Sequence, residues 1–390
     1  RVGSSAFTIN TSGSRNTAIG AIALGGNTTG IENTAVGSYA SQFNTIGSSN
    51  AAVGSFALYS NTSGSNNTAL GWHTLYNTTS SNNTAVGSEA LGFNTSGIYN
   101  TAVGLQSLYY FTTGNYNTAL GWNAIGGVSS ISTGSLNTGL GTGTLNVNTS
   151  GSQNVAVGSD ALKTNSTGFN NIAVGNQSLY NFASGSANVG LGYNALYGVS
   201  GSSTGSFNTA LGDSTLKLNT TGSSNVAVGS SALGSNSSGS QNVALGSSAG
   251  LSNTSPSNTY CTYIGYNTGC NSSTTTYGTS TAIGANAVIS ASNQIALGTS
   301  AETVYVSGTL NVNTSGSGTF IVRDASGNGS IRQENGNLVV RSNVNAAGIY
   351  FQTKNSTGTQ DNRLLITYGT TTVYNTLYAS GGILFASGGT

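Results

Sequence analysis

Apolar and polar residues recur along this chain with a period of about 17 residues, marked by the motif Asn-Thr-Ala-x-Gly. We number each repeat from the glycine of this motif, which is position 0. Consecutive position-0 glycines are 17 residues apart in most repeats, 16 apart once and 20 apart twice. The register holds from Gly20 to Gly246, loosens, and stops after Gly298. The sequence therefore predicts a repeat region over residues 1–298, irregular from about residue 250, and a different unit over residues 299–390.

Positions −3 to −1 of the repeat have the pattern of a short β-strand. Side chains of a strand alternate between its two faces, so positions −3 and −1, which hold Thr, Val, Ile or Leu, share one face. We expect this face, together with the leucine that is usual at position +4, to form the interior of a coil. The alanine at position −2 then lies on an outer face that carries little side-chain bulk.

The repeat length excludes helical repeats, which need about 33 residues or more. Glycines at positions 0 and −7 mark two corners, because glycine adopts left-handed backbone conformations without steric cost. Two short strands joined by turns fit such a unit, and stacking the units at about 4.8 Å gives a β-solenoid. The predicted fold class is therefore all-β, a parallel β-solenoid or β-roll followed by a separate β-rich C-terminal unit that caps the solenoid or sets its register.

Asparagine occupies position −4 in repeat after repeat. Equivalent side chains of stacked coils lie above one another and can form a hydrogen-bonded ladder; the alternative is that these asparagines only fill turns. The predicted ladder comprises Asn16, Asn33, Asn50, Asn67, Asn83, Asn100, Asn117, Asn137, Asn154 and Asn171.

The predicted outer face of alanine and glycine favours self-association. Three apolar side chains per coil make a thin core, while small residues permit the close approach of another backbone. We expect this face to pack against copies of the chain around a fibre axis, since obligate interfaces resemble a divided core. The alternative is a monomeric solenoid whose alanine face is solvated.

The motif Asn-Thr-Ala-Val-Gly-Ser-x-Ala-Leu resembles the head repeats of trimeric autotransporter adhesins, and residues 154–158 and 242–246 are most similar to them. This resemblance implies a left-handed parallel β-roll and a homotrimer. Residues 280–312 resemble fibre-type proteins of large DNA viruses and tailed phages. Together these resemblances imply an extracellular fibre or adhesin segment on a virion or cell surface, which attaches to a glycan or protein receptor or forms a filament.

Composition limits the classes of partner that this chain can bind. Charged residues are 4% of the chain and the net charge is +1, so there is no basic surface for nucleic acid. No apolar run approaches the roughly 18 residues of a membrane span. The chain contains no Met, and its first residues, Val2 and Gly3, already lie within the repeat pattern, so we expect further residues upstream.

Candidate chemistry is sparse, and we predict that the chain is not an enzyme and holds no metal or cofactor. The single histidine, His73, is expected to be a surface turn residue. Trp72, Trp122 and Tyr193 each follow a position-0 glycine; they either form an exposed row that stacks on sugars or pack at a corner. A polysaccharide depolymerase, one alternative function, needs two carboxylates within about 5–10 Å, whereas the acidic residues are scattered along the chain.

Cysteine and hydroxyl residues leave alternatives open. Cys261 and Cys270 are nine residues apart in the irregular region, where they form either a disulfide or two free thiols. A row at position −9 suggests an ice- or carbohydrate-binding surface, although its place in turns favours corners: Thr28, Thr45, Thr62, Thr78, Thr95, Thr112 and Thr149. Sequons for N-glycosylation, many of which arise by chance in such a composition, include Asn27, Asn61, Asn94, Asn148, Asn219 and Asn355.

Overall fold

The protein separates into two units, Arg1–Tyr305 and Val306–Thr390. The computed structural model describes residues 2–128, 132–199, 203–251, 258–271, 275–299, 301, 304–307, 352–354 and 360–362.

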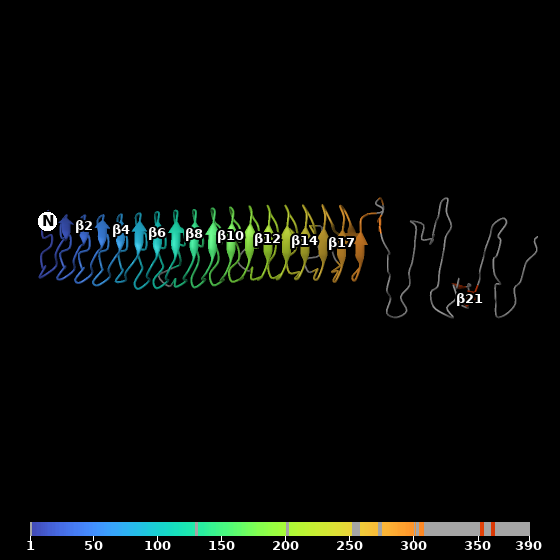
Figure 1. Cartoon of the computed structure of the whole chain (residues 1–390), viewed down its shortest axis with the longest axis horizontal. Helices are drawn as coiled ribbons and strands as arrows, with labels where there is room; N and C mark the ends of the chain where they lie inside the picture. The colour runs from blue at the N-terminus through green and yellow to red at the C-terminus, as the bar shows by residue number, and fades with distance from the viewer. Residues whose placement is uncertain are drawn as a thin grey trace, which may run out of the picture. The chain divides into compact units, whose positions relative to one another are not determined.

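The first unit is a parallel β-solenoid in which 17 short strands form one continuous sheet (Figure 1). Each strand pairs in register with the next, so that Ala18 lies beside Ala35 and Ala35 beside Ala52. The described residues contain no helix. The predicted all-β solenoid is therefore confirmed, whereas its left-handed sense and a homotrimer stay predictions. The strands are β1 (Thr17–Ile19), β2 (Thr34–Val36), β3 (Ala51–Val53), β4 (Thr68–Leu70), β5 (Thr84–Val86), β6 (Thr101–Val103), β7 (Thr118–Leu120), β8 (Thr138–Leu140), β9 (Val155–Val157), β10 (Ile172–Val174), β11 (Val189–Leu191), β12 (Thr209–Leu211), β13 (Val226–Val228), β14 (Val243–Leu245), β15 (Thr262–Ile264), β17 (Thr281–Ile283) and β19 (Ile295–Leu297).

Each regular coil contains one strand, so the prediction of two strands per coil was wrong there. Among the described residues, a second pair of parallel strands forms only in the irregular region, between β16 (Gly269–Cys270) and β18 (Val288–Ile289). In the other coils, backbone hydrogen bonds between successive turns replace the second strand. The Leu108 N–H donates to the Ala124 carbonyl at 3.0 Å, for example. In the second unit, β20 (Gln352–Lys354) pairs antiparallel with β21 (Gln360–Asn362).

The strands face the opposite way from the prediction. In β4, Ala69 is 1% exposed and its neighbour Leu70 is 47% exposed. The same holds along the sheet: alanine at position −2 points into the coil, and positions −3 and −1 point out of it. The coil is narrow, so its interior beside the strand has room only for a methyl group, and β-branched residues are turned outward. The alanine and glycine surface proposed for self-association is therefore interior and unavailable to a partner.

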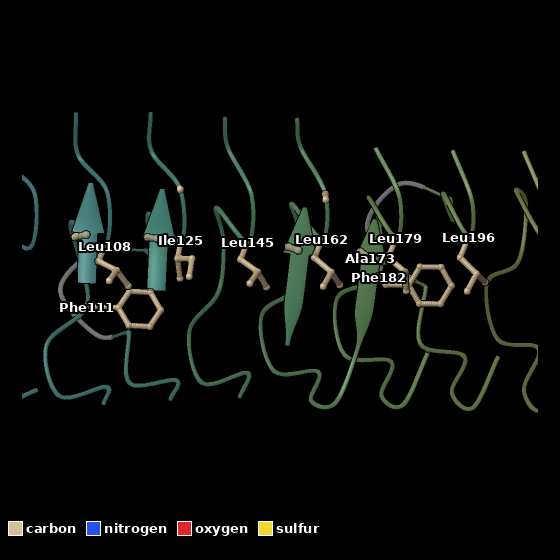
Figure 2. Packing of buried hydrophobic residues seen from close by; sticks show 14 of the residues in the cluster. Leu108, Phe111, Ile125, Leu145, Leu162, Ala173, Leu179, Phe182 and Leu196 are labelled. Atoms are coloured by element: carbon tan, nitrogen blue, oxygen red, sulfur yellow. The ribbon is translucent and has the colours of Figure 1, made fainter. Parts of the chain in front are cut away.

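The interior is filled from the opposite side of the coil by the residue at position +4, as expected. Leu108, Leu145, Leu162 and Leu179 lie one above another in successive or nearby coils and are fully buried (Figure 2). Burying one leucine side chain stabilises a fold by about 1.5–3 kcal/mol. The column therefore supplies the main apolar contribution of each regular coil.

The two expanded, 20-residue repeats have a structural cause. Phe111 and Phe182 occupy position −10, where other coils hold a smaller side chain, and both are buried among the leucines (Figure 2). Each pairs through a parallel bridge with the following, expanded coil, Phe111 with Ser132 and Phe182 with Ser203. The insertion widens the coil so that it accommodates a phenylalanine ring.

Left-handed backbone conformations recur at three non-glycine positions of the coil, −5, +2 and +4. Tyr116, Gln106 and Leu108 have φ values of 57°, 56° and 50°. Each such residue costs roughly 1–2 kcal/mol, which the hydrogen bonds between coils offset. At position 0 the requirement is stricter. Gly104 has φ 128°, and a Cβ there would fall on the carbonyl of Gly121 in the next coil, so only glycine fits.

Candidate functional site

The asparagines at position −4 form a continuous chain of hydrogen bonds through the stack. The Asn100 Nδ2 donates to the Gly114 carbonyl at 2.8 Å, and its Oδ1 accepts from the Asn117 backbone N–H at 2.9 Å. Equivalent N–H to Oδ1 bonds join every pair from Asn16 to Asn242. Each side chain therefore ties its own coil to a neighbour in a region closed to water.

A second asparagine ladder lies at position −10, which the sequence analysis missed. The Asn44 Nδ2 donates to Asn27 Oδ1 at 2.8 Å, and the Asn61 Nδ2 donates to Asn44 Oδ1 at 2.9 Å. The same amides also donate to the carbonyl of the glycine three residues later. These residues recur less regularly than the first ladder, and they lie in Asn-Thr-Ser-Gly stretches that read as turns. Other residues take the place of Asn in five coils: Thr78, Phe111, Ser132, Phe182 and Ser203.

The second ladder changes the interpretation of the sequons. Five of the six candidate glycosylation sites belong to it and are fully buried: Asn27, Asn61, Asn94, Asn148 and Asn219. Their side-chain amides donate hydrogen bonds inside the coil. A glycan on these nitrogens is incompatible with the folded solenoid. Asn355 lies outside the described residues.

Five of the seven threonines in the row at position −9 donate to the next coil, whereas the Thr78 Oγ1 is bonded to the Ser80 Oγ of its own coil. The Thr28 Oγ1 donates to the Thr45 carbonyl at 2.8 Å, and the Thr45 Oγ1 donates to the Thr62 carbonyl at 2.7 Å. Thr95 and Thr149 make the corresponding bonds. These hydroxyl groups therefore hold adjacent coils together at this corner.

The three aromatic residues that follow a position-0 glycine are exposed, not packed. Trp72, Trp122 and Tyr193 are 48%, 54% and 53% exposed. They lie three and four coils apart, which corresponds to about 14 and 19 Å along the stack. The structure therefore does not bring them together as one platform. Trp72 instead stacks on His73, with ring centroids 3.8 Å apart.

Aromatic side chains gather elsewhere, on the surface formed by positions +2, +5 and +6. Tyr59 and Tyr76, both at position +5 of adjacent coils, stack with centroids 5.0 Å apart and an interplanar angle of 6°. The next +5 residue is Gly92, and a hollow of about 180 Å³ opens at this point. The hollow is lined by His73, Tyr76, Asn77, Glu89, Gly92, Phe93 and Tyr109. We call it the Gly92 hollow.

The Gly92 hollow carries one carboxylate. The Glu89 Oε2 accepts a hydrogen bond from Gln106 Nε2 at 2.6 Å, and neither of the ion pairs found in the described residues involves Glu89. Desolvation lowers the pKa of His73, and the Glu89 charge partly opposes this shift. The imidazole is therefore neutral at pH 7. Desolvation and the same carboxylate raise the pKa of Tyr109.

Cys261 and Cys270 are both buried and are not joined to each other, so the disulfide alternative is not realised in the structure. The Cys261 Sγ lies 3.5 Å from the Tyr277 carbonyl oxygen. The Asn258 Nδ2 lies 3.7 Å from Cys270 Sγ. Both thiols pack inside the irregular coils and contact different groups.

Acidic residues of the solenoid remain dispersed. Glu32, Glu89, Asp160 and Asp213 lie on coils at least three apart, or about 14 Å along the stack. Within the described ranges, no three His, Cys, Asp or Glu side chains gather to hold a metal ion. The same part of the chain has no helix long and apolar enough to cross a membrane.

No protein-family model matches the chain, and no curated protein matches its sequence.

Proposed function

We propose that the solenoid is a rigid segment of an extracellular fibre on a virion or cell surface. The observation that supports this most directly is the unbroken, in-register stack of 17 strands, in which Asn side chains bond each coil to the next from β1 to β15. Sixteen steps of about 4.8 Å give a length of roughly 77 Å. A rod of this kind transmits force and separates what lies at its two ends.

Self-association is the second part of the proposal, through a different face from the one expected. The outward positions −3 and −1 of all 17 strands carry no charged side chain. Leu70, Leu120 and Leu191 are 47–49% exposed on this face. Extended exposed apolar patches mark interaction surfaces. The patch measures about 80 by 10 Å, or roughly 800 Å², which is close to one side of a standard protein interface.

A further copy of this chain is the occupant that fits the face. The rows of Val, Leu and Ile recur once per coil, so a partner makes equivalent contacts along the whole length only if it has the same repeat. Another copy has this repeat and the same lack of charge. The adhesin-like motif favours three copies around one axis. Assembly of this kind presents each surface feature several times, which increases avidity for a receptor.

Lysine substitutions test this proposal. We expect Leu70→Lys, Leu120→Lys and Leu191→Lys, combined in one chain, to weaken self-association at least tenfold, since three buried charges are costly in an apolar interface. Analytical ultracentrifugation measures the association, and small-angle scattering measures the shape. The wild-type chain should be an oligomer that contains a rod at least as long as the 17-strand stack.

The matched control is Ser96→Lys, Thr113→Lys and Thr167→Lys, which adds the same charge at exposed turn positions. This variant should associate as the wild type does, and both variants should keep the circular dichroism of the folded chain. A monomeric wild type would refute self-association. A compact wild-type particle that lacks the elongated shape of a rod would refute the fibre.

A further inference from the structure

The Gly92 hollow lies where a column of tyrosine side chains at position +5 lacks one member. Position +5 holds Tyr59, Tyr76 and Tyr109 in neighbouring coils, and glycine replaces tyrosine between the last two. The backbones of Tyr76 and Tyr109 are therefore two coils apart, about 9.6 Å along the stack. The omitted side chain leaves a space beside these rings, and a Cβ at Gly92 would lie 2.9 Å from Cε2 of Tyr109.

Four of the lining residues have aromatic side chains. Tyr76, Phe93 and Tyr109 surround the space, and Phe93 contacts Tyr109 edge to face at 5.0 Å. His73 stacks on Tyr76 at 4.6 Å and holds that ring in place. Aromatic faces attract cations through their quadrupole, and cages of such rings recognise quaternary ammonium groups.

The charge of the hollow favours the same ligand class. Glu89 provides a negative charge, and the basic residues described in the solenoid, Arg15, Lys163 and Lys217, lie on distant coils. An anionic ligand would be repelled there. The volume of about 180 Å³ is below the roughly 300–1,000 Å³ of pockets for drug-sized ligands. A compact headgroup fits this volume better than an oligosaccharide.

We propose that the Gly92 hollow binds a small organic cation of the methylated-ammonium class. The aromatic rings contact the methyl groups, and the Glu89 carboxylate neutralises the charge. Other glycines at position +5 open hollows without this combination. The hollow at Gly234 is lined by Lys217 and no aromatic ring, and that at Gly25 has one ring, Phe43, and no carboxylate.

The test uses choline as the probe and 3,3-dimethylbutan-1-ol as its neutral analogue of the same shape. Saturation-transfer NMR detects the N-methyl protons of bound choline, and the fluorescence of Trp72, in a Trp122→Phe background, provides a second signal. We expect saturable binding of choline with a dissociation constant of roughly 1–10 mM. The neutral alcohol should bind at least about fivefold more weakly.

Two substitutions locate the site. Gly92→Tyr restores the tyrosine column and fills the hollow, and other coils already accept tyrosine at this position; it should abolish binding. Glu89→Gln keeps the shape and removes the charge, and should weaken binding about five- to tenfold. Gly234→Tyr, the same change at the hollow without an aromatic cage, should leave binding unchanged.

Four outcomes would overturn the proposal. These are no saturable signal in either measurement, equal affinity for choline and the neutral alcohol, binding that survives Gly92→Tyr, and preference for methyl glucoside, which would indicate a sugar platform. None of these results bears on the rod or its self-association, because the lysine variants test those separately.

Discussion

Replacing Phe182 by alanine should lower the free energy of unfolding of the solenoid by about 3–5 kcal/mol, the usual cost of removing a buried phenylalanine ring. Phe182 is fully buried and packs beside the leucine column. The walls of the resulting cavity have little freedom to collapse. The Phe182 N–H donates to the Leu179 carbonyl, and the Ala183 N–H donates to the Ser203 carbonyl of the next coil at 3.1 Å. Urea denaturation at fixed protein concentration measures the change.

Phe169→Ala is the matched control for this substitution, because Phe169 is 51% exposed and surface substitutions usually change stability by less than about 0.5 kcal/mol. Phe182→Asn separates ring packing from ladder chemistry. It restores the residue type usual at position −10, but the widened coil holds its neighbours too far away for a compact amide. We expect it to destabilise the solenoid as much as alanine does. A stable Phe182→Asn variant would contradict the explanation of the expanded coils.

The period and parallel stacking were predictable because they follow from backbone spacing. Every repeat has the same length within a few residues, and coils of equal length stack in register whatever their side chains do. The faces were not predictable from strand alternation alone. Alternation places Ala69 and Leu70 on opposite faces of the strand. The usual preference for burying the larger apolar residue then predicts that Leu70 is buried, whereas the structure buries Ala69.

The small size of nearly every side chain at position −2 was the signal that would have predicted the correct buried face. Position −2 is alanine or glycine in nearly every strand, with Tyr263 the exception in the irregular region, whereas position −3 varies among Thr, Ala, Val and Ile. A position that tolerates only the smallest side chains is enclosed. The same reasoning applies to the Gly92 hollow. Its walls depend on left-handed residues such as His73 and Glu89, whose conformation no sequence preference predicts.

The ladder at position −4 makes a second strong prediction. Asn100→Ala should lower the free energy of unfolding by about 2–6 kcal/mol, because it leaves two buried backbone groups without their partners at about 1–3 kcal/mol each. The groups are the Gly114 carbonyl and the Asn117 N–H. Removal of Asn100 should be costly because the Gly114 carbonyl has no second asparagine donor. In other coils the asparagine at position −10 also donates to the equivalent carbonyl, as Asn94 does to Gly97. In the coil of Gly114, position −10 is Phe111.

Asn176→Ala is the control, since Asn176 is exposed and the expected change is within about 0.5 kcal/mol. Asn83→Ala extends the comparison within the ladder. The Gly97 carbonyl still accepts from Asn94 after Asn83 is removed, so Asn83→Ala should cost less than Asn100→Ala. Equal costs would mean that the ladder stabilises the coil through the N–H to Oδ1 bond alone. A change below about 1 kcal/mol in both variants would show that the asparagines only fill turns.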